Sequence, residues 1–108
     1  MADLKEKKCV PCEGGVPPLG DKDIRDLLEQ LPPDWKVTDN KKISKSFPFE
    51  NFRRGMAFVQ EIARVAEQEN HHPDICISYE KVHVELSTHA INGLSENDFI
   101  LAAKIENL

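Results

Sequence analysis

The stretch from Glu67 to Asp74 limits the fold most strongly, because it ends a helix and leads into a hairpin. Apolar residues recur at helical spacing from Asn51 to Asn70, as expected for an amphipathic helix, and Pro73 cannot continue that helix. Two β-rich runs follow, Ile75–Tyr79 and Val82–Leu86, separated by two residues. This spacing predicts a β-hairpin, which brings the start of the first run beside the end of the second.

Three of the four histidines flank this predicted hairpin: His71, His72 and His89. We therefore expect their imidazoles to gather at one end of a sheet. Adjacent side chains on a connection point in different directions, so His71 and His72 cannot both face the core in the same way. A lone histidine is usually a buried structural residue, but three that converge indicate a functional site. His83 falls on the polar face in mid-strand, and we expect it to be structural or solvated.

Two chemistries are open to such a cluster. Three histidines and a water form a familiar zinc site, although adjacent histidines in a loop fit tetrahedral geometry poorly. General acid–base catalysis is the alternative, since imidazole gains and loses a proton near neutrality and needs no cofactor. The sequence has no phosphate- or nucleotide-binding motif. No Ser or Cys is positioned to act as a nucleophile with a histidine as its base. Glu67 lies in the last turn of a helix, where the partial negative charge of the helix end disfavours a carboxylate. It is therefore either a functional acid or a solvated surface residue.

The sequence before this region predicts a helix and two strands. Gly20 is the expected N-cap of a helix whose apolar stripe runs from Ile24 to Leu31, and the Pro32-Pro33 pair stops it. A short strand, Trp35–Thr38, follows. Lys42–Phe49 alternates apolar and polar residues, and Pro48 indicates a strand near a sheet edge. For Trp35 the residue pattern favours core packing over the lining of a pocket.

A third helix is predicted after His89. Ser95 is its expected N-cap and Asp98 stands at N3, where capping is a sufficient local role for the carboxylate. The helix should continue to Asn107.

Residues 1–18 are charged and then rich in Gly and Pro, which predicts an extended, weakly ordered arm before a domain of residues 19–108. Its chemical motif is Cys9-x-x-Cys12. A zinc site needs further ligands, and a redox pair usually opens a helix, whereas Pro11 and two glycines surround this one. A reduced arm packed on the surface is therefore favoured over a metal or redox role.

Composition excludes several classes of protein. The net charge of −5 argues against sequence-independent binding to nucleic acid. No apolar run is long enough to span a membrane, and the N-terminus has no signal-peptide core. Three cysteines do not make a disulfide framework. We expect one soluble, cytoplasmic domain.

Three motifs carry a resemblance to a known family: Glu67-x-x-Asn70-His71-His72-Pro73-Asp74, then Tyr79-x-Lys81-Val82-x-Val84-x-Leu86-x-Thr88-His89, then Gly93-Leu94-Ser95-x-x-Asp98. With Leu31-Pro32-x-x-Trp35 and Phe47-x-Phe49-x-x-Phe52, they resemble pterin-4a-carbinolamine dehydratase over about residues 19–108. The segment from Cys9 to Pro18 also resembles plant and microbial members. Asn70, Gly20 and Asp34 depart from residues frequent in the family, and none of these departures touches the histidines.

The resemblance implies an α+β fold, in which three helices pack on one face of a four-stranded antiparallel sheet, and an assembly into homodimers or homotetramers. It also implies a reaction without a cofactor or a metal. Water is eliminated from 4a-hydroxytetrahydrobiopterin to give quinonoid dihydrobiopterin, in the recycling of tetrahydrobiopterin after aromatic amino acid hydroxylases turn over.

The resemblance assigns roles to particular residues. His71 and His89 become the acid and base candidates, and His72 orients the pterin. Glu67 is expected to hydrogen-bond an imidazole or the pterin ring, and Asp98 to support the site. The other residues expected to bind substrate are Trp35, Asn70, Pro73, Ser87 and Thr88.

A second function comes with the same resemblance. Some animal members act as dimerisation cofactors for a homeodomain transcription factor, binding its helical segment and not DNA. The arm from Cys9 to Pro18 resembles members outside that lineage, so the dehydratase is the first hypothesis. The physiological pterin stays open, since members also occur where no aromatic hydroxylase is obvious.

Overall fold

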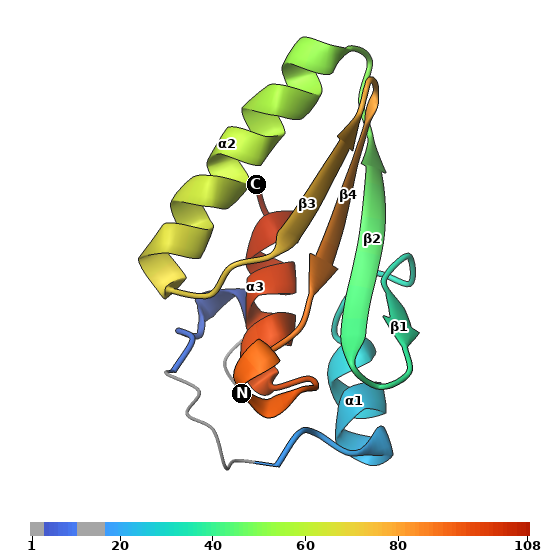
Figure 1. The fold of residues 1–108 in the computed structure, drawn as a ribbon, viewed down its shortest axis with the longest axis vertical. Coiled ribbons are helices and arrows are strands. Elements are labelled where there is room, and N and C mark those ends of the chain that lie inside the picture. Colours follow the sequence, from blue (N-terminus) through green and yellow to red (C-terminus); the bar gives the residue numbers. More distant parts are fainter. Residues whose placement is uncertain (1–3, 11–16) are drawn as a thin grey trace.

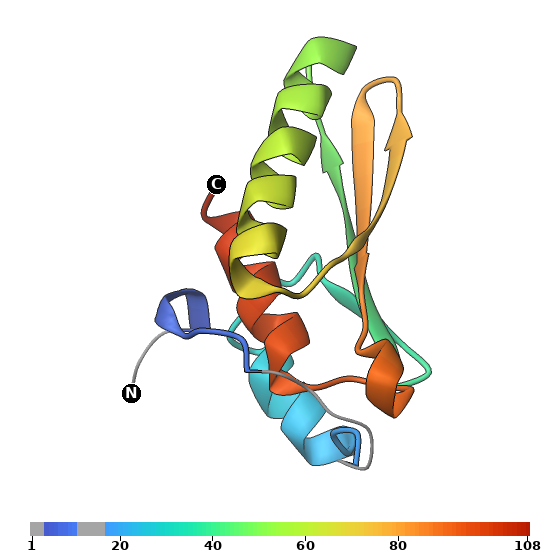
Figure 2. The same ribbon diagram turned by 60° about the vertical axis from the view of Figure 1, so that its left-hand side comes forward.

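The computed structural model describes residues 4–10 and 17–108. Within them a four-stranded antiparallel sheet, in the order β1-β2-β4-β3, is covered on one face by three α-helices (Figures 1 and 2). The α+β fold implied by the resemblance is confirmed. The elements are η1 (Leu4–Glu6), α1 (Asp21–Leu28), β1 (Lys36–Thr38), β2 (Lys42–Pro48), α2 (Phe52–Glu69), β3 (Asp74–Ser78), β4 (Lys81–Leu86), η2 (His89–Ile91) and α3 (Glu96–Glu106).

The helices begin where their caps predict. Asn51 precedes α2, and its side chain accepts a hydrogen bond of 3.0 Å from the Arg54 N–H, which satisfies a donor that the first helical turn leaves free. Asn70 ends α2 in the left-handed region, at φ 53°, a conformation that asparagine tolerates. Gly20 is the N-cap of α1, as predicted, but α1 ends at Leu28, before the predicted stop at the prolines.

The predicted hairpin is confirmed, with its strand ends shifted by one residue. β3 and β4 pair antiparallel, with Asp74 opposite Glu85 and Ser78 opposite Lys81. Tyr79 lies in the turn at φ 21° and not in the strand. The register places residues 71–73 and 87–89 beyond the same end of the sheet, the end that β3 leaves from in Figure 1.

Apolar residues of the sheet pack against α2 and α3. Val82, Val84 and Leu86 of β4 are fully buried, together with Ile43 of β2. Gly55 lets α2 approach the sheet, because a Cβ added there would lie 3.4 Å from Val82 Cγ2. The helix side of this core includes Ile62, Val65, Phe99, Leu101, Ala102 and Ile105.

Two expectations about the edges of the fold need correction. β2 is an inner strand, since β1 lies on one side of it and β4 on the other. β1 pairs only with Lys42, Ile43 and Ser44, so the predicted edge character applies only to the rest of β2. The described part of the arm is folded, because η1 packs against α3 and Leu4 is buried in the core. No helix in residues 4–10 or 17–108 is long and apolar enough to cross a membrane.

Candidate functional site

His71 is tied to the start of α3 by a hydrogen bond to Asp98. Its Nε2 lies 2.6 Å from Asp98 Oδ1. The Asp98 side chain is fully buried and that of His71 is 12 % exposed. The other carboxylate oxygen, Oδ2, accepts hydrogen bonds from the Thr88 hydroxyl at 2.8 Å and from the Ser95 N–H at 3.0 Å. Asp98 thus joins the α2–β3 connection, the end of β4 and the beginning of α3.

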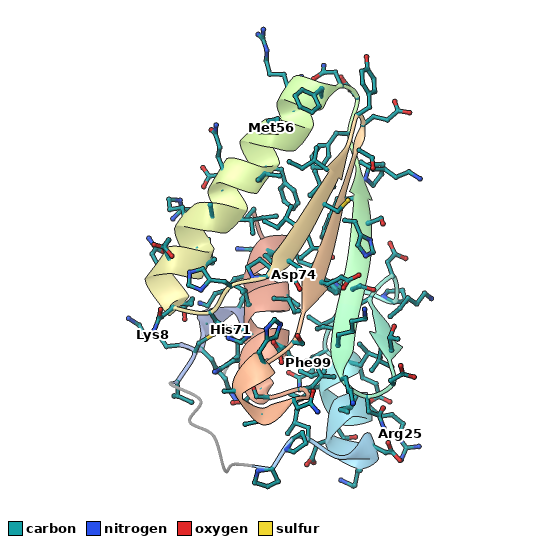
Figure 3. All side chains as sticks on the ribbon, viewed as in Figure 1. Lys8, Arg25, Met56, His71, Asp74 and Phe99 are labelled. Carbon is teal, nitrogen blue, oxygen red and sulfur yellow. The ribbon has the colours of Figure 1, made fainter. Side chains whose placement is uncertain are left out.

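This arrangement selects one tautomer of His71. Oδ2 of Asp98 accepts hydrogen bonds from a hydroxyl and an N–H donor, as an oxygen of an ionised carboxylate does. His71 therefore carries a proton on Nε2 and donates it to Asp98. Its Nδ1 is left to exchange a proton with another molecule. Figure 3 shows His71 between the end of α2 and α3.

The end of α2 turns the two adjacent histidines in opposite directions. The left-handed Asn70 ends the helix, and the His71 N–H still donates to the Ala66 carbonyl at 3.2 Å. His71 therefore faces inward, whereas His72 is exposed and its Nε2 contacts the exposed Glu67 carboxylate. The expectation that the two histidines face differently is confirmed. An exposed ion pair of this kind contributes little to stability.

His71 and His89 line separate cavities that share Thr88. His71 lies in a cavity of about 460 Å³, lined by Cys9, Val10, Gln68, Glu69, Asn70, His71, Thr88, Ala90 and Asn97. His89 lies in a cavity of about 470 Å³, lined by Thr38, Asp39, Lys41, Lys42, Ser87, Thr88, His89, Asn92 and Gly93. Of the residues predicted to bind substrate, Asn70, Ser87 and Thr88 thus lie beside one of these histidines. His72, Glu67 and Pro73 are in neither lining set.

Trp35 lies apart from the histidines. It is 2 % exposed, and its Nε1–H donates to Glu106 Oε1 at 2.9 Å, at the end of α3 opposite Asp98. Its ring meets Phe47 edge-on, with 6.1 Å between centroids. Trp35 therefore packs in the core, as the residue pattern predicted. The cavity that Trp35 borders is lined by Arg25, Leu28 and the Pro32-Pro33 pair, among others, and contains no histidine.

His83 lies on the outer face of the sheet, in agreement with its predicted separation from the cluster. Its Nδ1 is 2.8 Å from Ser46 Oγ, and its Nε2 is 3.1 Å from Glu85 Oε2. Glu85 also accepts a hydrogen bond of 3.2 Å from Lys42. That hydrogen bond, with a smaller contribution from His83, lowers the pKa of the Glu85 carboxyl.

Two features of the site escaped the sequence argument. Spacing gave Asp98 a capping role and the resemblance gave it a supporting role in the site, but neither indicated His71 as its partner. The arm residues Cys9 and Val10 line the His71 cavity, and no motif predicted this. Burial raises the pKa of the Cys9 thiol to about 12, and the neighbouring Glu69 carboxylate acts in the same direction. Cys12 lies outside the described residues, among which no group of three or more His, Cys, Asp or Glu could hold a metal ion.

Known proteins resemble this chain in sequence and fold. The sequence model of the family described as pterin 4 alpha carbinolamine dehydratase matches residues 17–108. A provisionally named pterin-4-alpha-carbinolamine dehydratase from Nitrosomonas eutropha is 52 % identical over 108 residues, which cover 100 % of this chain and 95 % of that protein.

Two solved structures extend the comparison. A Brucella melitensis protein described as a transcriptional coactivator/pterin dehydratase has a TM-score of 0.77 and 32 % identity, over 83 % of this chain and 96 % of its own. A pterin dehydratase-like protein identified as a RuBisCO assembly factor of the alpha-carboxysome has a TM-score of 0.59 and 21 % identity, over 68 % and 87 % of the two chains. The second likeness shows the fold alone.

Proposed function

This chain belongs to the pterin 4 alpha carbinolamine dehydratase family, and we propose that it eliminates water from 4a-hydroxytetrahydrobiopterin in the cytoplasm, giving quinonoid dihydrobiopterin. The observation that carries this proposal is the hydrogen bond from His71 to the buried Asp98 beside a cavity of about 460 Å³. It supplies a positioned imidazole of the kind that general acid–base catalysis requires.

The reaction needs two proton transfers and no redox step. The bond from C4a to the hydroxyl oxygen breaks, and the oxygen leaves as water once it has received a proton. N5 loses its proton, and its electron pair forms the C4a–N5 double bond. One group must therefore donate a proton on the hydroxyl side, while another accepts a proton at N5.

His71 and His89 are assigned to these two transfers. When Nδ1 of His71 takes up a proton, the ring becomes an imidazolium whose Nε2–H remains bonded to Asp98. The carboxylate stabilises that cation, so His71 suits the removal of the N5 proton. His89, in the cavity on the other side of Thr88, then donates to the leaving hydroxyl. The exposed His72 holds the ring, and Glu67 positions His72.

A direct assay tests this proposal. Purified protein is added to freshly generated 4a-hydroxytetrahydrobiopterin, and the appearance of the quinonoid product is followed by absorbance against the uncatalysed rate. We expect a faster reaction that survives exhaustive chelation, because the proposed chemistry uses imidazoles alone. A rate equal to the background would refute the activity. Activity lost to a chelator and restored by zinc would refute the metal-free mechanism.

The Brucella melitensis protein is described as a transcriptional coactivator as well as a pterin dehydratase, which favours a coactivator role as the second hypothesis. The resemblance gives that role as the binding of a transcription-factor helix. A pull-down against helical partners, made with wild-type protein and with His71→Ala, distinguishes the two hypotheses. Capture that does not need the histidine, in a protein without dehydratase activity, would favour the binding role.

Self-association is also part of the proposal. Among the described strands β3 pairs with β4 alone, so its other edge presents backbone donors and acceptors to a second chain. We expect a homodimer or homotetramer by light scattering at micromolar concentration. A monomer of 12.3 kDa would contradict this expectation.

A further inference from the structure

The N-terminal arm forms part of the cavity that contains His71. Cys9 and Val10 line this cavity together with residues of α2, α3 and the connection after β4. The family model matches residues 17–108, so these two residues lie outside the segment that it matches. Figure 3 labels Lys8 and His71 at the same end of α2.

Asn97 clamps the backbone of Val10 from two sides. The Val10 N–H donates to Asn97 Oδ1 at 3.0 Å, and Asn97 Nδ2 donates to the Val10 carbonyl at 2.6 Å. Asn97 belongs to α3 and is buried. A side-chain amide that satisfies both backbone groups of one residue fixes its position in the way a neighbouring strand would.

A second attachment links the arm to α2. The Cys9 N–H donates to Glu69 Oε1 at 2.8 Å. Glu69 ends α2, where the partial negative charge of the helix disfavours a carboxylate. The amide of Cys9 offsets that penalty, and so does Lys104, at 3.8 Å from the carboxylate. The arm therefore bridges α2 and α3, and Leu4 anchors it in the core.

Val10 remains 65 % exposed although its backbone is held in place. An apolar side chain kept in water beside a cavity gains stability when a ligand covers it. Because the clamps already order the backbone, a ligand that packs against Val10 loses little free energy to ordering the arm. The conjugated amide and guanidine-like atoms of a reduced pterin lie nearly in one plane and present a face suited to such a contact.

We propose that Val10 packs against the face of the bound pterin, and that Asn97 and Glu69 are positioning residues that hold the arm for this contact. The inference rests on the proposed function, since it names a further residue that binds the same substrate.

Binding of 7,8-dihydrobiopterin, a reduced pterin without the 4a-hydroxyl, measures the contribution of Val10. Val10→Ala removes two methyl groups and should raise the Kd of this pterin, and the KM of the substrate, by about three- to tenfold with kcat unchanged. Val37→Ala is the matched control, because Val37 is also an exposed valine but lies on β1 outside the cavity. If wild-type protein binds the reduced pterin and turns over the substrate but Val10→Ala has an unchanged Kd, the proposed role of the arm is overturned. The proposed dehydratase function would not be affected by that result.

Wild-type protein that neither binds the reduced pterin nor accelerates the dehydration would overturn the proposed function, and this inference with it. A change in Val37→Ala as large as that in Val10→Ala would show a general loss of apolar surface and would also overturn the specific contact.

The clamp is tested separately by hydrogen exchange and by alkylation of Cys9. In Asn97→Ala the Val10 amide should exchange faster and the Kd should rise at least as much as in Val10→Ala. In a Cys12→Ser/Cys76→Ser background, saturating 7,8-dihydrobiopterin should slow alkylation of Cys9, because Cys9 lines the same cavity. This readout keeps the proposal testable where Asn97→Ala does not fold. Alkylation at the same rate with and without bound pterin would overturn it.

Discussion

The Nε2 atom of His71 lies 2.6 Å from Oδ1 of Asp98, a residue 27 positions further along the chain. Asp98 also accepts a hydrogen bond from the Ser95 N–H at the start of α3. One buried carboxylate therefore caps a helix, orients an imidazole and holds Thr88 at the end of β4. The orientation of the His71 ring therefore depends on the position of α3, because the carboxylate that holds the ring also caps that helix.

Asp98→Asn should lower kcat by about 10²-fold or more, since it removes the carboxylate that stabilises protonated His71. The amide presents a donor where His71 also donates, so the pH dependence of kcat should change together with its magnitude. Steady-state kinetics across pH, with thermal unfolding of the same samples, separate this effect from lost stability. A folded variant with the wild-type kcat and pH profile would show that Asp98 is structural alone.

Replacement of either histidine proposed to be catalytic should lower kcat while leaving the protein folded. A positioned acid or base contributes ~10²–10⁴-fold in rate, although a fast uncatalysed reaction limits the loss that can be measured. His71→Ala and His89→Ala should act on kcat, and the double variant should fall short of the product of the single losses. His72→Ala should act mainly on KM, because the proposed role of this exposed residue is to hold the pterin ring.

His83→Ala provides the control for these variants. His83 contacts Ser46 and Glu85 on the outer face of the sheet, so its loss should leave kcat and KM near wild type. If folded His83→Ala lost as much kcat as His71→Ala, the assignment of the site to the histidines at the end of the sheet would be wrong.

Gly93→Ala should destabilise the loop that follows His89. A Cβ at Gly93 would lie 2.5 Å from Cβ of Pro18, a rigid neighbour, and such overpacking costs about 1–3 kcal/mol. Urea unfolding measures the loss, and kcat should fall as well because Gly93 borders the His89 cavity. Gly20→Ser is the matched control: a Cβ there has no atom within 4 Å, and serine is a good N-cap. Equal stability of Gly93→Ala and wild type would contradict the packing.

The partly buried thiol of Cys9 should lower the free energy of unfolding at high pH. Its pKa is raised to about 12 in the folded protein, whereas an unfolded thiol ionises near pH 8.5. Between these values the folded state keeps a proton that the unfolded state has lost, so the free energy of unfolding falls as pH rises. Cys9→Ser should show a shallower fall between about pH 8 and pH 10.5 in urea titrations. Cys76→Ser, at an exposed position, should keep the wild-type slope, and identical slopes for all three proteins would contradict the burial of Cys9.

Local signals in the sequence were sufficient for the elements and for the end of the sheet where the histidines lie. Asn51 and Gly20 mark helix starts, Pro73 marks the end of α2, and the two-residue connection sets the hairpin. Each of these features is satisfied by atoms a few residues away, so spacing along the chain is enough to predict it.

The partners of the functional side chains were decided by tertiary packing alone. Asp98 meets His71, and Val10 meets Asn97 across 87 positions, whereas Trp35 is turned into the core toward Glu106. The residue pattern favoured a core position for Trp35 but did not indicate Glu106 as its partner. Nothing in the local spacing of Asp98 or Val10 differs from that of a simple cap or an exposed valine. Their distances follow from how α2 and α3 settle on the sheet, because burial of the shared apolar core determines where each helix end comes to lie.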